Sequence, residues 1–193
     1  MNRFLSNRVT VRVLVLAVSV LLPCAGRMQG AASMPATGIS GTISTPLIIY
    51  MDSELTGDVN CAVPLTNPGA NPCISFGADH IKLQLNGHTI TGPVTPPTGC
   101  SLPTDTMYGV GIEAIDRTDV QIEGPGIIQD FQRWGILLGL TGHPSSEVTV
   151  QKVTVYRNCW SGMQTISTSE SLFEENVFDD DAGGSNGASC GGT

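Results

Sequence analysis

An aromatic and basic group in the second half of the chain has the side chains best suited to bind a ligand. Its members are Arg133, Trp134, Tyr156, Arg157 and Trp160. Aromatic faces stack on sugar rings, and an arginine guanidinium pairs with carboxylates such as those of uronic acids. The spacing also allows Trp134 and Trp160 to stack on each other as neighbouring layers of a repeat. The pattern therefore predicts either an exposed sugar-binding group or a structural aromatic ladder.

The densest acidic segment is the run Asp179, Asp180 and Asp181, which glycines follow closely. Ca²⁺ takes roughly six to eight oxygen ligands without strict geometry, and an oxygen-rich flexible loop can provide them. Three adjacent aspartates also repel one another and commonly form no more than a solvated corner. A calcium site and a solvated corner are both consistent with this run.

Pairs of carboxyl groups are the candidates for a catalytic site. Hydrolysis of a glycosidic bond needs two carboxyl groups that flank the bond, one protonated and one charged. Candidate pairs are Glu123 with Asp130 and Asp116 with Asp119, although the sequence does not fix either separation. His88 has a side chain that can act as a base near neutral pH, but a histidine at a corner can equally bond to a neighbouring backbone.

The first 32 residues have the layout of a secretory signal peptide. Three arginines precede an apolar run over residues 13–22, and Gly30-Ala31-Ala32 supplies small residues before a cleavage site at Ser33. This run is too short to span about 30 Å of hydrocarbon as a helix. We therefore expect an exported protein, extracellular, at the cell surface or periplasmic, with no integral membrane segment once the signal is removed.

Removal of residues 1–32 leaves five of the six cysteines, which in an exported chain are more often disulfide partners than metal thiolates. Cys61 and Cys73 flank a loop rich in proline, asparagine and glycine. We predict a disulfide between them, because closing such a loop stabilises a segment with little core of its own. The odd number leaves one thiol over. No Cys-x-x-Cys pattern occurs, so a zinc or redox site is not expected.

The charge balance disfavours anionic partners. Four of the nine basic residues lie in the first 32 residues, which hold no acidic residue, so the rest carries five basic against 17 acidic side chains and a net charge near −12. Phosphate backbones and anionic membranes would repel such a chain, so nucleic acid is not expected as a partner. Glycine (23) and proline (12) together make about 18% of the residues, a composition typical of turns and thin strands.

A repeat of about two dozen residues positions these side chains. Alternating apolar and polar segments recur at 81–90, 120–128, 148–155 and 172–178. Glycine followed by isoleucine or methionine recurs between them, at 111–112, 135–136 and 162–163. Such alternation predicts half-buried strands, and stacking successive copies about 4.8 Å apart would bury their apolar sides in ladders. An antiparallel sandwich is the competing fold and would need a hairpin at every turn. Here one unit repeats in the same order, as a solenoid requires.

The segment Leu83-Gln84-Leu85-Asn86-Gly87-His88-Thr89-Ile90, with the glycine repeats that follow it, resembles the right-handed parallel β-helix proteins of the pectate-lyase-like superfamily. It is similar in particular to a secreted bacterial family of carbohydrate-binding and sugar-hydrolysis modules. The resemblance implies an all-β fold, a right-handed parallel β-helix with rungs of about 22–28 residues. The resemblance covers residues 55–193, which we expect to form the β-helix domain, after the signal peptide over 1–32 and a lead-in over 33–54.

The enzymes of this superfamily act on acidic polysaccharides at the outer face of the coil, but their motifs are missing here. The polygalacturonase motifs Asn-Thr-Asp, Gly-Asp-Asp, Gly-His-Gly and Arg-Ile-Lys do not occur, nor does the Asp-Pro-His motif of β-helix epimerases. Residues 190–193 fall where a further Gly-Ile strand would begin, so we expect a β-helix that is incomplete at this end. The sequence predicts a secreted module that binds polysaccharide. The alternatives are a polysaccharide lyase, epimerase or glycoside hydrolase, and a structural stalk or adhesin.

Overall fold

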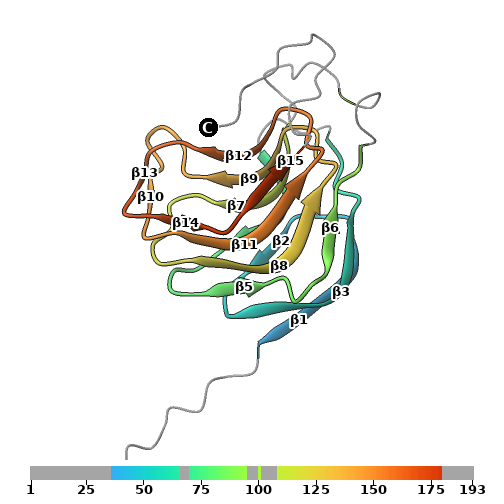
Figure 1. The fold of residues 1–193 in the computed structure, drawn as a ribbon, viewed down its shortest axis with the longest axis horizontal. Helices are drawn as coiled ribbons and strands as arrows, with labels where there is room; N and C mark the ends of the chain where they lie inside the picture. The colour runs from blue at the N-terminus through green and yellow to red at the C-terminus, as the bar shows by residue number, and fades with distance from the viewer. Residues whose placement is uncertain (1–35, 66–69, 95–99, 101–107, 180–193) are drawn as a thin grey trace, which may run out of the picture. The chain divides into compact units, whose positions relative to one another are not determined.

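The computed structural model describes residues 36–65, 70–94, 100 and 108–179. These residues form strands, turns and irregular connections but no helix (Figure 1), so the predicted all-β class is confirmed. A helix long and apolar enough to cross a membrane is accordingly not found in this part of the chain. The predicted signal peptide lies outside the described residues.

Two parallel sheets make up most of the fold. The eight-stranded first sheet consists of β1 (Thr37–Ile43), β3 (Ser53–Cys61), β5 (Lys82–Gln84), β6 (Thr89–Thr91), β8 (Gln121–Gln129), β11 (Thr149–Tyr156), β14 (Leu172–Glu174) and β15 (Val177–Asp179). The five-stranded second sheet consists of β2 (Leu47–Ile49), β4 (Ala70–Phe76), β7 (Tyr108–Ala114), β9 (Trp134–Leu138) and β12 (Ser161–Thr165). A third sheet pairs β10 (Ser145–Ser146) with β13 (Thr168–Ser169).

Every pairing between these named strands is parallel. The segment 33–54, for which the sequence predicts a lead-in, contains β1, β2 and the first two residues of β3, and these strands belong to the two large sheets.

Corresponding positions of the sequence repeat face each other in the first sheet. Ile122 on β8 lies opposite Leu83 on β5 and opposite Val150 on β11. Facing residues on β8, β11, β14 and β15 are separated by 23, 27 or 28 positions, within the predicted range. The separation is 38 or 39 positions between β8 and the strands β5 and β6, 30 or 31 between those strands and β3, and 16 or 18 between β3 and β1. The prediction of rungs of about 22–28 residues is therefore wrong for the earlier strands, where the largest separation includes the long segment between β6 and β7.

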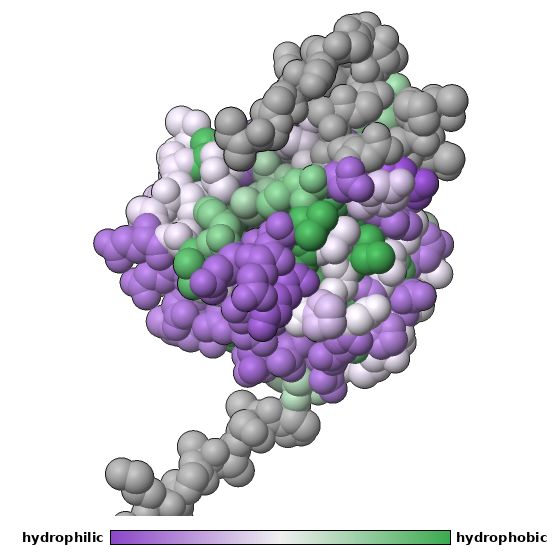
Figure 2. Space-filling model, viewed as in Figure 1, coloured by the Kyte–Doolittle hydropathy of each residue, from purple (hydrophilic) through white to green (hydrophobic). Residues whose placement is uncertain are grey.

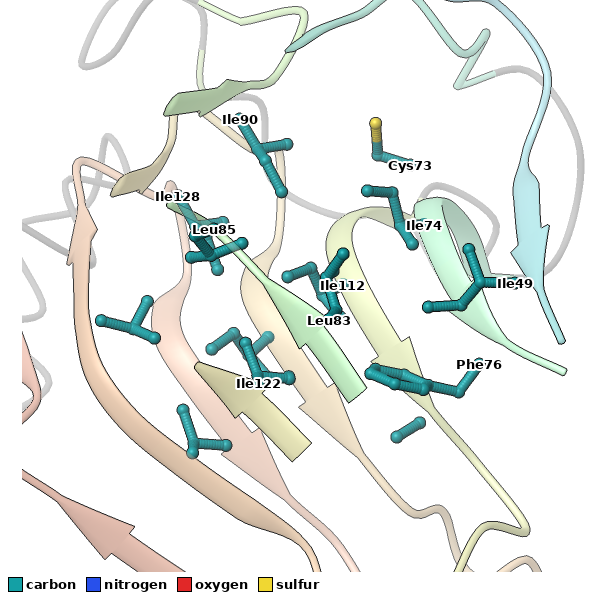
Figure 3. Packing of buried hydrophobic residues seen from close by; sticks show 14 of the residues in the cluster. Ile49, Cys73, Ile74, Phe76, Leu83, Leu85, Ile90, Ile112, Ile122 and Ile128 are labelled. Atoms are coloured by element: carbon teal, nitrogen blue, oxygen red, sulfur yellow. The ribbon is translucent and has the colours of Figure 1, made fainter. Parts of the chain in front are cut away.

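Inward-facing apolar side chains from both large sheets form one core. Register partners on successive strands form what we call a column. Leu83, Ile122 and Val150 belong to one column, and none of the three is exposed to solvent. Figure 3 shows Leu83, Ile112 and Ile122 gathered with apolar side chains from other strands. The two-residue alternation thus places the apolar set inward, where its removal from water stabilises the stack.

Glycines in the second sheet allow successive turns to approach closely. Ile112, Ile136 and Met163 are register partners, so the recurring glycine-isoleucine element forms one column. A side chain at Gly111 would overlap the carbonyl oxygen of Gly135 in the next turn. Space between the turns, rather than an unusual backbone angle, therefore requires glycine at this position.

Two disulfides join separate parts of the stack. Cys61 at the end of β3 is bonded to Cys73 on β4, the pair expected from the loop composition, with Cα atoms 5.7 Å apart. Cys100 is bonded to Cys159, with Cα atoms 5.4 Å apart. Both Cα separations lie in the usual range for a disulfide.

Candidate functional site

The predicted aromatic and basic residues gather where the chain leaves the first sheet for the second. β8 and β9, and one turn later β11 and β12, are joined by the short connections 130–133 and 157–160. Each connection begins with a residue in the left-handed backbone region, Asp130 with a φ of 64° and Arg157 with a φ of 52°. The Nη2 atom of Arg157 donates to Oδ2 of the buried Asp130 over 2.8 Å, so an ion pair ties the two bends together.

Asn158 fixes these two connections against each other. It is wholly buried, and its Oδ1 accepts a hydrogen bond from the backbone N–H of Phe131 at 3.0 Å. Its Nδ2 donates to the backbone carbonyls of Ile128 at 3.4 Å and Tyr156 at 3.3 Å. The side-chain amide therefore replaces main-chain partners that a bent segment lacks. The sequence analysis did not single out Asn158, because an isolated asparagine shortly after the alternating segment 148–155 is its only signal in the sequence.

Arg133, Trp134 and Trp160 form one group, which we call the aromatic cluster. The two indole rings are stacked, with centroids 6.0 Å apart and planes inclined by 27°. The guanidinium carbon of Arg133 lies 4.0 Å from the ring centroid of Trp134 and 4.3 Å from that of Trp160. Both distances are short enough for an aromatic face to attract a cation.

The aromatic cluster contains one buried and one accessible ring. Trp134 is only 5% exposed, because it opens β9, a strand that is buried along its whole length. The prediction of an exposed Trp134 is therefore wrong, and the alternative of an aromatic ladder between turns describes it. Trp160 is 39% exposed. Of the two rings, Trp160 can offer substantial surface to a ligand.

Main-chain bonds and a disulfide hold Trp160 in place. Its backbone N–H donates to the carbonyl of Arg133 at 3.1 Å, and the N–H of Cys159 donates to the carbonyl of Phe131 at 2.9 Å. Cys159 is also bonded to Cys100. The indole therefore projects from a fixed backbone.

Tyr156 and Arg157 form the second part of the predicted group. The guanidinium carbon of Arg157 lies 4.8 Å from the ring centroid of Tyr156. Tyr156 ends β11 opposite Gln129 of the preceding turn and Asp179 of the following one. Nε2 of Gln129 in turn donates to Oγ1 of Thr91 at 3.4 Å. Hydroxyl, amide and carboxylate groups thus form one column on the outer surface of the first sheet.

The carboxylates of the first candidate catalytic pair are each held by different partners. Glu123 accepts hydrogen bonds from Nε2 of Gln84 at 3.2 Å and of Gln151 at 3.3 Å. Asp130 is paired with Arg157 instead. Glu123 lies near the start of β8 whereas Asp130 follows its end, so the two side chains have separate surroundings.

All three histidines of the chain lie against an aspartate of a neighbouring turn. The contacts join Nδ1 of His80 to Asp119 at 3.0 Å, of His143 to Asp116 at 2.8 Å and of His88 to Asp58 at 3.6 Å. The second candidate pair, Asp116 and Asp119, is therefore divided between two histidines. The hydrogen bond between His80 and Asp119 is the main cause of a raised pKa for His80 and a lowered pKa for Asp119.

Glu113 on β7 is a half-buried carboxyl group that sequence reasoning did not single out. Burial raises its pKa, and a hydrogen bond from Oγ of Ser75 to Oε1 at 3.3 Å offsets this only in part. Its Oε2 is buried and has no hydrogen-bond partner among the described residues. A perturbed carboxyl of this kind can mark a functional site or a purely structural position.

The predicted calcium residues lie at the end of the described chain. Asp179 closes β15 with an exposed side chain, and its backbone carbonyl accepts a hydrogen bond from the N–H of Arg157 at 3.1 Å. Asp180 and Asp181 lie outside the described residues. In the ranges that the structure describes, no group of three or more histidine, cysteine, aspartate or glutamate side chains could hold a metal ion.

Comparison of the chain with protein-family models, with curated proteins and with solved structures found no match.

Proposed function

We propose that this protein is an exported right-handed parallel β-helix module that binds polysaccharide. Parallel pairing of successive strands and continuous apolar columns support this fold, since stacked coils require both. The two disulfides are consistent with export, because such bonds persist in oxidising compartments.

The observation that carries the binding proposal is the state of Trp160. Its ring is 39% exposed, yet it is stacked on Trp134 and contacts the guanidinium of Arg133. An aromatic ring that is already ordered loses little side-chain entropy when a ligand stacks on it. Trp160 therefore has the properties of a platform for the apolar face of a sugar ring.

The surroundings of Trp160 favour an uncharged polysaccharide. Arg133 lies over the tryptophan rings and Arg157 is bonded to Asp130, so both cations near the platform already have partners. The chain beyond residue 32 carries five basic against 17 acidic side chains. A uronate polymer would meet net repulsion, whereas the hydroxyl and amide groups of Tyr156 and Gln129 suit neutral hydroxyls.

Affinity electrophoresis in gels that contain soluble polysaccharides tests this proposal. Neutral xylan, glucomannan and mixed-linkage glucan should retard the protein more than polygalacturonate or alginate. Trp160→Ala should weaken retardation about tenfold, which corresponds to roughly 1.4 kcal/mol. Tyr50→Ala is the matched control, because Tyr50 is an aromatic residue that is 64% exposed and lies outside the aromatic cluster.

Equal retardation of Trp160→Ala and the unchanged protein would contradict the platform. Mass spectrometry of the same polysaccharides after incubation separates binding from catalysis. With the incubation in deuterated water, binding alone leaves every polymer intact. A lyase or hydrolase would shorten the polymer, and an epimerase would introduce deuterium at constant length.

A further inference from the structure

The last described turn of the first sheet leaves large apolar side chains uncovered. Leu172 and Phe173 on β14 are 50% and 40% exposed, and Val177 and Phe178 on β15 are 53% and 47% exposed. Figure 2 shows hydrophobic surface beside strongly hydrophilic surface on the face where these strands lie. Exposed apolar surface that gathers in this way commonly marks an interaction site.

Two of these side chains continue columns of the core. Phe173 lies opposite Val150, and Phe178 lies opposite Val155. Both valines are completely buried, because the next turn covers them. The phenylalanines occupy the same inward positions, and their exposure therefore reflects the lack of a covering layer in the described residues.

The two outer edges of the first sheet are both free within the described residues. β14 and β15 pair with β11 on one side, and β1 pairs with β3 at the opposite end of the strand order. An edge strand presents unpaired N–H and C=O groups that can accept another strand. Since all strands run in parallel, β1 of a second copy could join β14 and β15 in the same direction.

The side chains at the two edges fit each other in size. The column that ends at Phe178 begins at Gly41, and runs through Val155, Ile128, Ile90 and Val59. The column that ends at Phe173 begins at Thr37, and runs through Val150, Ile122, Leu83 and Ser53. Continuing both columns into a second copy would place a large phenylalanine over a small residue, as a filled core requires.

Charge favours contact between opposite edges of two copies over contact between two identical edges. Exposed carboxylates surround the apolar end, namely Glu170, Glu174, Glu175 and Asp179. The opposite edge has no charged residue between positions 36 and 51. Two acidic ends would repel each other, whereas an acidic end and an uncharged end would not.

From these observations we propose that copies of this chain associate head to tail, with β14 and β15 of one copy paired to β1 of the next. The contact is heterologous, so it leaves a free end at each side of a dimer and allows longer assemblies. This association goes beyond the proposed sugar binding and does not depend on it.

Cysteine cross-linking tests the pairing directly. Asp179 and Thr42 are both exposed and stand at opposite ends of one outward column, so the proposed contact makes them neighbours. Adjacent strands place facing Cα atoms about 5 Å apart, a separation that a disulfide can bridge. Asp179→Cys and Thr42→Cys are introduced separately into the full chain, with Cys24 and Cys190 changed to serine.

A mixture of the two variants should give a disulfide-linked dimer under mild oxidation, whereas neither variant alone should. Self-linking of Asp179→Cys alone would overturn the proposal in favour of a symmetric contact. The lack of any cross-link in the mixture would also overturn it, whether sedimentation shows a monomer or an association through another surface.

Sedimentation of a charge variant gives an independent test that leaves the phenylalanines intact. Thr42→Asp would face Asp179 of the neighbouring copy, and like-charge repulsion should weaken association at least tenfold. Thr141→Asp adds the same charge at an exposed position outside both edges and should leave association unchanged. Equal association of the two variants would overturn the proposal.

Discussion

The side-chain Oδ1 of Asn158 accepts a hydrogen bond from the backbone N–H of Phe131, one turn earlier, at 3.0 Å in a fully buried site. Asn158→Ala removes this acceptor and leaves the N–H of Phe131 unsatisfied in the interior. An unsatisfied buried group costs about 1–3 kcal/mol, and the lost donor adds to this. We expect the free energy of unfolding to fall by about 3 kcal/mol, measured by urea unfolding with the disulfides intact.

Asn176 offers a matched control for this prediction. Its Oδ1 accepts from the N–H of Val153 at 3.0 Å and its Nδ2 donates to the carbonyl of Val150 at 2.8 Å, but it is only half-buried. Water can replace some of these bonds, so Asn176→Ala should cost about 1 kcal/mol. Equal losses for the two variants would show that burial does not set the cost.

A charge in the inner column should disrupt the stack. Ile122 is fully buried between Leu83 and Val150, and Ile122→Asp would place a carboxylate there without a partner. Such burial costs several kcal/mol, enough to unfold a marginally stable domain. Circular dichroism should show loss of cooperative thermal unfolding for this variant. Thr149→Asp on the outward face should retain it, and full stability of Ile122→Asp would refute the inward assignment.

The two tryptophans should differ in their effect on stability. Trp134 is buried, so Trp134→Ala leaves a cavity and should cost about 3–5 kcal/mol. Trp160 is more exposed, and Trp160→Ala should cost about 1 kcal/mol. Thermal unfolding of both variants measures the difference. A larger loss for Trp160 than for Trp134 would contradict the division of the aromatic cluster into a buried and an accessible ring.

The strand pattern could be predicted from sequence because it depends on local alternation and on repeated spacing. Ile122 and Val150 occupy equivalent positions of two similar segments, and the structure places them opposite each other. Turn lengths were predictable only where the repeats are closely spaced. The separation of 39 residues between Gln84 and Glu123 reflects an inserted segment, which alternation does not reveal.

The candidate site was predicted less completely, because burial depends on contacts between turns. Trp134 precedes a glycine just as an exposed aromatic could, and only the packing of β9 shows it to be buried. Asn158 and Glu113 were missed for a related reason. A single polar residue gives no periodic signal, and its importance comes from the backbone or side chain that the neighbouring turn brings to it.

The pair of His80 and Asp119 should make a pH-dependent contribution to stability. The pKa of His80 is raised from an ordinary 6.5, so its contribution is present below pH 6.5 and is lost as the pH rises through the folded-state pKa. The pKa of Asp119 is lowered from 3.8, so its contribution is present above pH 3.8 and is lost as the pH falls through the folded-state pKa. Both contributions are present between these two ordinary values.

An NMR titration of the His80 ring measures this coupling. Asp119→Asn should return the midpoint toward the ordinary histidine value, because the hydrogen bond to a carboxylate is the main cause of the shift. Asp116→Asn, which removes the carboxylate opposite His143, should have a smaller effect on His80. An unchanged midpoint in Asp119→Asn would contradict the assigned cause.

Glu113 should destabilise the fold once it ionises. Its pKa is raised above the ordinary 4.5, mainly by burial, so the folded state holds its proton to higher pH than the unfolded state does. Stability therefore falls as the pH rises from 4.5 through the folded-state pKa, and the cost persists above it. Glu113→Gln removes the ionisation and should raise the melting temperature at pH 7 more than at pH 4. Glu174→Gln, at an exposed position, should change little at either pH, and a Glu113→Gln variant less stable than the unchanged protein at pH 7 would show that the carboxylate is favourably bound.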